Sequence, residues 1–270
     1  MVTHLVYSSL HLSPLRSFPF SSLSLTSPLP SSRFARAGAR LRRRPIMAAV
    51  LPESTLLHDI GVSALASGKL NRKLVHISVG LVFLLFWPHF SPGRYAPFLA
   101  ALAPGINSVR MLLLGLGLWK NDAMVKSMSR FGNYRELLKG PLYYACTITL
   151  ATSLLWRTSP IAIALICNLC AGDGVADIVG RRFGNKKLPY NPSKSYAGTV
   201  SMVLAGFIAS IGFMYYFHLF GLMQENRNTI LGFFLTSLAA AIVESLPISS
   251  DLDDNLTVPL TSFLVGSFVF

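Results

Sequence analysis

Long apolar stretches separated by short polar connections dominate the chain from residue 74 onward. A helix needs about 20 mainly apolar residues to cross the hydrocarbon core of a membrane. The pattern predicts six or seven membrane-spanning helices, within Leu74–Gly93, Tyr95–Trp119, Gly140–Trp156, Ser159–Gly180, Ser195–Gln224, Thr229–Pro247 and Asn255–Phe270. Residues 56–70 are short and mixed, which favours an interfacial helix. We therefore expect an all-α fold, a polytopic integral membrane helical bundle whose brief connections hold no separate soluble domain.

Composition supports a membrane protein. The chain is 52% hydrophobic and 13% charged, whereas soluble domains carry about 25% charged residues. The apolar content excludes a disordered chain. Three cysteines in 270 residues exclude a secreted disulfide scaffold. Cys167 and Cys170 lie inside an apolar stretch, and we interpret them as small buried hydrophobic residues.

The first 50 residues have a different composition. They hold seven arginines and ten serines but no Asp, Glu or Lys, which is typical of an organelle transit peptide. The excess of serine over arginine in the first thirty residues favours the plastid. We predict a chloroplast transit peptide at residues 1–50 and a membrane domain at residues 51–270, placed in a chloroplast membrane. A disordered basic tail is the alternative. We expect no nucleic-acid partner, because the basic run at Arg40–Arg44 has no core of its own.

Four ionisable residues interrupt the apolar stretches: Arg110, Asp173, Asp177 and Glu244. A charge at membrane depth costs about 3 kcal/mol or more on insertion scales, so such residues are the first candidates for function. An arginine can instead extend its head group to the interface, and an aspartate is too short to do so. The two aspartates are therefore the stronger candidates.

Asp173 and Asp177 are four residues apart, so a helix places both carboxylates on one face. Two such carboxylates repel each other unless a cation lies between them. Mg²⁺ is usually held by one or two carboxylates together with substrate phosphates. Basic residues follow closely: Arg181, Arg182, Lys186, Lys187 and Lys194. This arrangement predicts Mg²⁺ on Asp173 and Asp177, bound to a polyphosphate that the basic residues neutralise.

Small residues recur every fourth position at Gly172, Ala176, Gly180 and Gly184. Such a stripe favours close helix packing, and it also allows a nucleotide to approach the backbone.

A proline-punctuated loop, residues 189–195, precedes the next helix, which Ser193 or Ser195 could cap. The free N–H groups of that helix would form an anion site beside Lys194. Gly198 would let the backbone come close. The chain has neither a Walker motif nor a G-x-G-x-x-G after a strand, so a P-loop enzyme or a Rossmann enzyme is not supported.

Two linked motifs match a known family. The run Asp173-x-x-Ala176-x-x-x-Gly180-x-x-x-Gly184, followed by Ser193-Lys194-Ser195-x-Ala197-Gly198, resembles the CTP-binding motif of dolichol kinases and related polyprenol kinases. The chain departs from that motif at Ser193, Ser195 and Ala197, where the family has Lys, Thr and Glu. Those departures reduce the charge around the triphosphate. Three further segments, Asn71–His76, Arg135–Leu142 and Glu244–Asn255, look like the plant chloroplast phytol and farnesol kinases. The resemblance covers residues 69–270.

The resemblance implies an enzyme, a kinase that transfers the terminal phosphoryl group of CTP, with Mg²⁺, to the hydroxyl of an isoprenoid alcohol. The alcohol would be phytol, or else farnesol or geranylgeraniol, and the product would enter phytol salvage, tocopherol and prenyl-lipid metabolism. The residues expected to bind the nucleotide are Gly180, Arg181, Arg182, Gly184, Lys187, Lys194, Ser195 and Gly198.

Other polar residues complete the candidate site. Asp254 is our choice for a catalytic carboxylate, either as the base that accepts the alcohol proton or as a second metal contact. The additional candidates are Arg72, Lys73, His76, Arg135, Glu136, Lys139, Glu244, Asp253 and Asn255. Positive anchoring at the membrane face is the alternative for the first group, and a solvated charge cluster is the alternative for Arg135–Lys139.

Two other functions fit parts of the pattern. A membrane CTP-dependent lipid-phosphate cytidylyltransferase would also use Mg²⁺ and membrane aspartates. A transporter could use the intramembrane acidic residues as an ion path. If the protein is a kinase, the expected partners are an isoprenoid alcohol, a nucleoside triphosphate and the lipid bilayer.

Overall fold

The structure is a computed structural model, and it describes residues 70, 72–129, 132–247 and 252–270. The predicted transit peptide, residues 1–50, lies outside the described residues. So does the predicted interfacial helix, apart from its last residue.

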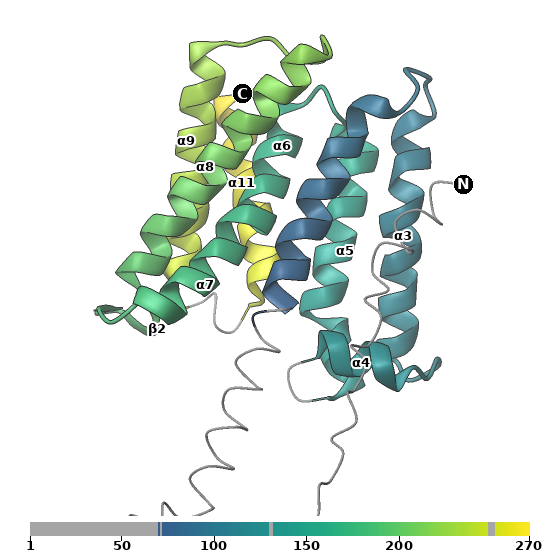
Figure 1. Cartoon of the computed structure of the whole chain (residues 1–270), viewed down its shortest axis with the longest axis vertical. Coiled ribbons are helices and arrows are strands. Elements are labelled where there is room, and N and C mark those ends of the chain that lie inside the picture. The colour runs from purple at the N-terminus through teal and green to yellow at the C-terminus, as the bar shows by residue number, and fades with distance from the viewer. Residues whose placement is uncertain (1–69, 71, 130–131, 248–251) are drawn as a thin grey trace, which may run out of the picture. The chain divides into compact units, whose positions relative to one another are not determined.

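Helices account for most of the described chain, in agreement with the predicted helical bundle (Figure 1). A helix at 72–86 leads into the 3-10 turn η1 (Trp87–His89). The helices that follow are α3 (Ala96–Gly115), α4 (Asp122–Met128), the 3-10 helix η2 (Tyr134–Leu138), α5 (Gly140–Leu150), α6 (Pro160–Cys167), α7 (Asp173–Phe183), α8 (Tyr196–Leu219), α9 (Arg227–Ser245) and α11 (Asp254–Val269). Two π-helical segments, η3 (Ala151–Leu155) and η4 (Asn168–Gly172), continue α5 and join α6 to α7.

Local sequence sets where these helices begin. Proline occupies one of the first two positions of α3, α5 and α6, where its missing N–H costs nothing. Side chains cap several others, including the last three helices of the described chain. Ser195 caps α8, Asn226 caps α9 and Asp253 caps α11, each by accepting a hydrogen bond from a backbone N–H of the first turn.

Four helices of the described chain are long and apolar enough to cross a membrane: Ala96–Gly115, Pro160–Phe183, Tyr196–Leu219 and Arg227–Ser245. The continuous helix 160–183 consists of α6, η4 and α7. The predicted count of six or seven spans is not confirmed, because the helix at 72–86, α5 with η3, and α11 are shorter.

A short β-hairpin corrects the expectation of a purely helical chain. β1 (Lys187–Leu188) pairs antiparallel with β2 (Asn191–Ser195), with Lys187 opposite Ser195 and Leu188 opposite Asn191. The sequence predicted only a loop here. Pro192 is tolerated in β2 because a two-stranded hairpin consists of edge strands alone.

The core lies around helix 160–183. Ile163, Ile166, Trp87, Phe217 and Phe233 are completely buried in one cluster on its sides. α8 and α11 pack directly against this helix, and α9 packs against both of them. Figure 1 shows the hairpin and the first turn of α11 at the same end of the bundle.

The stripe of small residues faces α8. A Cβ atom added to Gly198 of α8 would lie 3.1 Å from the carbonyl oxygen of Ala176 and 3.4 Å from Cα of Gly180. The two backbones are therefore in direct contact, as the packing interpretation of the stripe expects.

Candidate functional site

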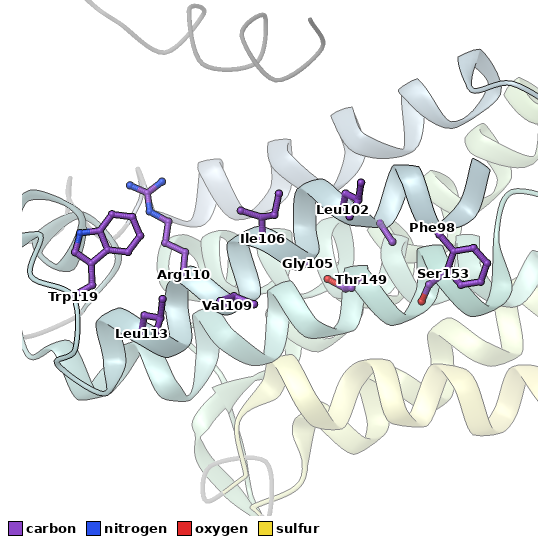
Figure 2. A pocket seen from close by; sticks show the side chains of 11 residues that line it. Phe98, Leu102, Gly105, Ile106, Val109, Arg110, Leu113, Trp119, Thr149 and Ser153 are labelled. Atoms are coloured by element: carbon purple, nitrogen blue, oxygen red, sulfur yellow. The ribbon is translucent and has the colours of Figure 1, made fainter. Parts of the chain in front are cut away.

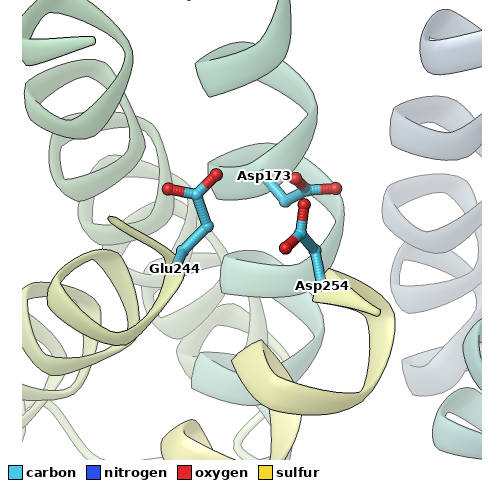
Figure 3. A group of neighbouring side chains, drawn as sticks. All are labelled: Asp173, Glu244 and Asp254. Carbon is cyan, nitrogen blue, oxygen red and sulfur yellow. The ribbon is translucent and has the colours of Figure 1, made fainter. Parts of the chain in front are cut away.

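Three carboxylates from three helices meet at the hairpin end of the bundle (Figure 3). Asp173 begins α7, Glu244 is the last residue but one of α9, and Asp254 begins α11. One oxygen from each lies within 4.8 Å of the others. Asp173 and Glu244 are buried, with 2% and 4% of their surface exposed. We call these three residues the carboxylate cluster.

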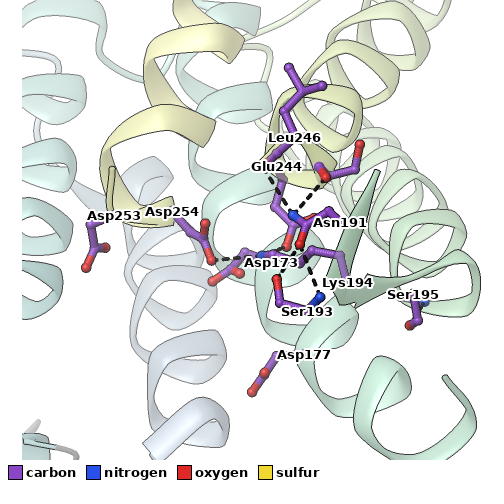
Figure 4. Close-up of polar contacts among 12 residues, drawn as sticks. Asp173, Asp177, Asn191, Ser193, Lys194, Ser195, Glu244, Leu246, Asp253 and Asp254 are labelled. Atoms are coloured by element: carbon purple, nitrogen blue, oxygen red, sulfur yellow. Dashed lines mark hydrogen bonds and ion pairs between the residues drawn. The ribbon is translucent and has the colours of Figure 1, made fainter. Parts of the chain in front are cut away.

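Two lysines from outside these helices hold the carboxylate cluster together. Lys73, near the start of the helix at 72–86, places its Nζ 2.8 Å from Oδ2 of Asp173. Lys194 of β2 lies between the other two carboxylates, donating to Glu244 and, at 3.1 Å, to Oδ2 of Asp254 (Figure 4). Three carboxylates and two lysines leave one net negative charge among the five groups.

His76 lies next to Asp173. Its Nε2 lies 3.6 Å from Oδ2 of Asp173 and 3.1 Å from the carbonyl oxygen of Leu169. The ring of Tyr144 packs 4.2 Å from the imidazole, centroid to centroid, and its hydroxyl donates to the carbonyl oxygen of His76 at 2.8 Å. The first helix is thereby fixed against both α5 and η4.

The hairpin holds Lys194 in place through Asn191. Nδ2 of this buried asparagine donates to the carbonyl oxygens of Ser245 and Leu246, at 3.1 and 3.3 Å. Its Oδ1 accepts from both the backbone N–H and the hydroxyl of Ser193. One side chain therefore ties β2 to the end of α9, next to Glu244.

The surroundings shift the pKa values of Lys194 and Asp254, which lie at the hairpin end of the bundle and outside the four candidate spans. Burial by itself lowers the pKa of Lys194, but the charges of Asp254 and Glu244 outweigh it and raise the pKa above its usual value. Burial raises the pKa of Asp254 to about 6, against the opposing effect of Lys194. Asp254 is therefore a carboxyl that can gain a proton near neutral pH.

Asp177, expected to share a metal ion with Asp173, lies outside the carboxylate cluster (Figure 4). It is paired instead with Arg181, whose Nη2 is 2.8 Å and Nε 2.9 Å from Oδ1 of Asp177. That pair lies one turn apart on the exposed part of α7. Helical spacing of four allows either a shared cation or such an ion pair, and the structure has the ion pair.

The other residues expected to bind nucleotide surround the hairpin. Ser195 caps α8 by accepting from the N–H of Gly198 at 3.2 Å. Ser193 bonds Asn191 instead. A Cβ atom added to Gly184 would lie 2.5 Å from Oγ of Ser195, so the backbone is tightly packed there. Lys187 and Arg182 are exposed on the same end, the latter against the ring of Phe183.

The remaining candidates divide between the start of α11 and the neighbouring loop. Asp253 caps α11, accepting from the N–H and the side-chain amide of Asn255 at 3.0 and 2.7 Å. A Cβ atom added to Gly140 would lie 3.1 Å from that amide, so the segment that ends in Lys139 and Gly140 contacts this cap. Arg135 and Glu136 lie in η2, the former against the ring of Tyr134.

Arg72 and Arg110 contact other parts of the protein than the carboxylate cluster. Arg72 donates to the carbonyl oxygen of Met128 at 3.5 Å. Arg110 stacks on Trp119, 5.5 Å from its ring centroid, at one end of an apolar groove of about 780 Å³ between α3 and α5 (Figure 2). None of the three carboxylates lines this groove. It is therefore separate from the carboxylate cluster.

Sequence reasoning did not identify Asn191 or Tyr144. Asn191 lies between Tyr190 and Pro192 in a segment that we interpreted as a loop, and the preference of asparagine for turns was the only available signal. Tyr144 lies in an apolar stretch where an aromatic residue is ordinary. Only the fold shows that its hydroxyl meets the backbone of His76.

Fold and site together define a helical protein with four helices long and apolar enough to cross a membrane, and with an acidic site at one end of the bundle whose charge two lysines partly neutralise. No protein-family model and no solved structure matches the chain. Curated proteins do. The chain is 63% identical over 263 residues to a probable phytol kinase 2, chloroplastic, of Oryza sativa subsp. japonica, an alignment that covers 90% of this chain and 86% of the relative.

Two further relatives have Arabidopsis thaliana as their source. A farnesol kinase, chloroplastic, is 49% identical over 291 residues, covering 96% of this chain and 94% of the relative. Phytol kinase 1, chloroplastic, is 39% identical over 249 residues, covering 84% and 82%. The chain belongs to the family of plant chloroplastic phytol and farnesol kinases. The resemblance inferred from the motifs is thereby confirmed.

Proposed function

We propose that this protein phosphorylates the hydroxyl group of an isoprenoid alcohol, with a nucleoside triphosphate as the donor. The observation that carries the proposal is the carboxylate cluster with Lys73 and Lys194, in a chain whose relatives are named phytol kinase and farnesol kinase. In the reaction, the bond between the terminal phosphorus and its bridging oxygen breaks, and a bond from that phosphorus to the alcohol oxygen forms. The products are an isoprenyl monophosphate and a nucleoside diphosphate.

Mg²⁺ fits the carboxylate cluster. The ion prefers oxygen ligands and is usually bound by one or two carboxylates together with substrate phosphates. Three carboxylate oxygens lie close together, and the second oxygen of Asp254, Oδ1, is buried without a hydrogen-bond partner among the described residues. We propose that Asp173, Glu244 and Asp254 hold the ion, in place of the pair Asp173 and Asp177. When bound there, Mg²⁺ would neutralise charge on the phosphates.

The cations around the cluster suit a triphosphate. Lys194 and Lys73 are already held at the carboxylates, and Arg182 and Lys187 extend from the same end of the bundle. Fixed positive groups stabilise the charge that develops during phosphoryl transfer. We propose that Lys194 and Lys73 contact the transferred phosphoryl group, and that the exposed residues contact the rest of the nucleotide.

Asp254 is the proposed base. Burial raises the pKa of this carboxyl to about 6 in the metal-free protein, and a base is most effective when its pKa lies near the operating pH. The proton of the alcohol hydroxyl would pass to the carboxylate oxygen of Asp254 that does not hold the ion, as the new oxygen–phosphorus bond forms.

CTP is the proposed donor, on the strength of the match between residues 173–198 and the polyprenol kinase motif. Phytol is the proposed principal alcohol, with farnesol and geranylgeraniol as shorter or unsaturated alternatives, and the product would serve phytol salvage and the synthesis of tocopherol and other prenyl lipids. A chloroplast membrane is the proposed location. The chloroplastic relatives and the four apolar helices support it.

The test is a labelling assay on the full chain, expressed in membranes that lack endogenous activity. The membranes receive Mg²⁺, one of the three alcohols, and CTP or ATP labelled in the terminal phosphate. We expect labelled lipid monophosphate, with CTP the better donor. Asp173→Asn and Glu244→Gln should each reduce the rate by roughly 10³-fold, because each removes a carboxylate from the proposed metal site.

Glu225→Gln is the matched control. Glu225 is an exposed acid paired with His218, 3.8 Å away, in the connection between α8 and α9, and its loss should leave the rate unchanged. If a folded and inserted protein yields no labelled lipid with any pair of alcohol and nucleotide, the proposal of a kinase is refuted. A CDP-lipid with release of pyrophosphate would instead identify a cytidylyltransferase.

A further inference from the structure

A second polar junction lies deeper in the bundle than the carboxylate cluster. Asn168, the first residue of η4, accepts a hydrogen bond at Oδ1 from the hydroxyl of Ser237, at 2.8 Å. Its Nδ2 donates to the hydroxyl oxygen of Ser262 at 3.1 Å. All three side chains are buried, with at most 1% exposed. We call these three residues the asparagine junction.

The asparagine junction joins the same three helices that carry the carboxylates. Asn168 precedes Asp173 by five residues in helix 160–183. In α9, Ser237 precedes Glu244 by seven, and in α11, Ser262 follows Asp254 by eight. At a rise of about 1.5 Å per residue, the junction therefore lies about 7–12 Å from the carboxylates along each helix.

The π-helical segment η4 connects the asparagine junction to the carboxylate cluster. It runs from Asn168 to Gly172 and ends directly before Asp173. Residues five apart in an α-helix point about 140° away from each other. The wider turn made by hydrogen bonds between residues i and i+5 brings the directions of such residues closer together. The π turn therefore lets one helix direct Asn168 into the junction and Asp173 into the carboxylate cluster.

The fourth helix closes the junction. A Cβ atom added to Gly206 of α8 would lie only 2.2 Å from Oδ1 of Asn168 and 3.3 Å from Oγ of Ser237. A side chain at position 206 would displace the amide from its partners. The junction is thus enclosed on all sides by packed helices.

We propose that Asn168, Ser237 and Ser262 are positioning residues that fix the axial register of the three carboxylate-bearing helices. Because lipid is as apolar as the helix surfaces, packing and interhelical hydrogen bonds determine how membrane helices associate, and such a hydrogen bond is satisfied in one register. The register in turn sets the spacing of Asp173, Glu244 and Asp254. This inference rests on the proposed function of those carboxylates as a metal site.

The first experiment measures metal affinity with Mn²⁺ as the probe, by electron paramagnetic resonance of the purified full chain in detergent. Asn168→Ala, Ser237→Ala and Ser262→Ala should each weaken Mn²⁺ binding by about 10-fold, as losses of residues that orient metal ligands do. In the kinase assay they should raise the Mg²⁺ concentration for half-maximal rate and leave the KM for the alcohol unchanged.

Thr236→Val is the matched control. Thr236 is the buried neighbour of Ser237, and its hydroxyl donates to the carbonyl oxygen of Gly232 in its own helix, at 2.7 Å. Its loss removes a buried hydroxyl without breaking a bond between helices. If the three junction variants bind Mn²⁺ as tightly as Thr236→Val, the positioning role is overturned.

A second measurement is independent of metal and activity. Spin labels are attached at Ile242→Cys of α9 and Leu260→Cys of α11, both exposed, with Cys146→Ala to leave only buried native cysteines. We expect one narrow distance distribution, which Asn168→Ala broadens and Thr236→Val does not. An unchanged distribution refutes the register role. Failure of the unaltered protein to bind Mn²⁺ or phosphorylate an alcohol refutes the proposed function instead.

Discussion

Helix 160–183 and α3 are similar in length and hydropathy, but they differ in how deeply they are buried in the bundle. Both are apolar and long enough to span a membrane, yet 78% of the most apolar window of helix 160–183 is buried, against 28% for α3. Helix 160–183 carries Asn168 and Asp173 and ends in small residues that contact α8. α3 presents Phe98 and Ile106 outward and lines an apolar groove. Hydropathy predicts that a helix enters the membrane, whereas polar and small residues at regular spacing predict that it lies at the centre.

The largest effect expected from this comparison contrasts Lys194, a cation of the hairpin that reaches the carboxylate cluster, with Arg110, a cation of α3. Lys194→Met should lower the rate of phosphoryl transfer by roughly 10²-fold, because it removes a fixed donor from the reacting charge. Arg110→Met, at the end of the groove, should leave the rate close to that of the unaltered protein. Initial rates at saturating Mg²⁺ measure both. Equal losses from the two substitutions would mean that the groove takes part in the reaction and is not separate from the carboxylate cluster.

A smaller effect is expected from the packing of the inner helix. Ile166 is completely buried in the core cluster, so Ile166→Ala should leave a cavity. The cost should be about 2 kcal/mol, the low end of the range for such truncations, because transfer of a side chain between protein and lipid contributes little. Unfolding in mixed micelles measures it. A free energy of unfolding unchanged by this substitution would contradict the central position of helix 160–183.

The smallest effect is expected on the outer helix. Ile106 in α3 is 64% exposed, and lipid or detergent chains can fill the space that Ile106→Ala opens. The free energy of unfolding should change by less than about 0.5 kcal/mol, as for substitutions away from the core. The same micelle titration provides the comparison with Ile166→Ala. If Ile106→Ala costs as much as Ile166→Ala, Ile106 packs against protein and not against lipid or detergent.

Much of the site could be predicted from the sequence because acids are rare in this chain. Asp173 and Glu244 stood out as charges in apolar stretches, and Asp254 stood out beside a helix start. Their meeting in one cluster was not predictable, since periodicity relates residues within one helix and these three belong to different helices. The prediction that Asp173 and Asp177 share a metal ion rested on a spacing of four residues, and that spacing equally suits the ion pair of Asp177 with Arg181.

The helical class was predictable from apolar runs, and the hairpin was not. Residues 187–195 include two prolines and no alternation of apolar and polar residues, so their pairing depends on Asn191 reaching the end of α9. Asn168 was missed for a related reason. A single amide within an apolar stretch has no partner in its own helix, and its two serines lie 69 and 94 residues further along the chain.

The order of the carboxylates along the chain has a consequence for biogenesis. Asp173 and Glu244 are synthesised first, and Asp254 arrives only with α11, the last described helix. A chain in which α11 has not yet packed against the other helices lacks one of the three carboxylates, and among the described contacts Glu244 is then the one carboxylate paired with Lys194. The carboxylate cluster is therefore complete only when α11 is in place.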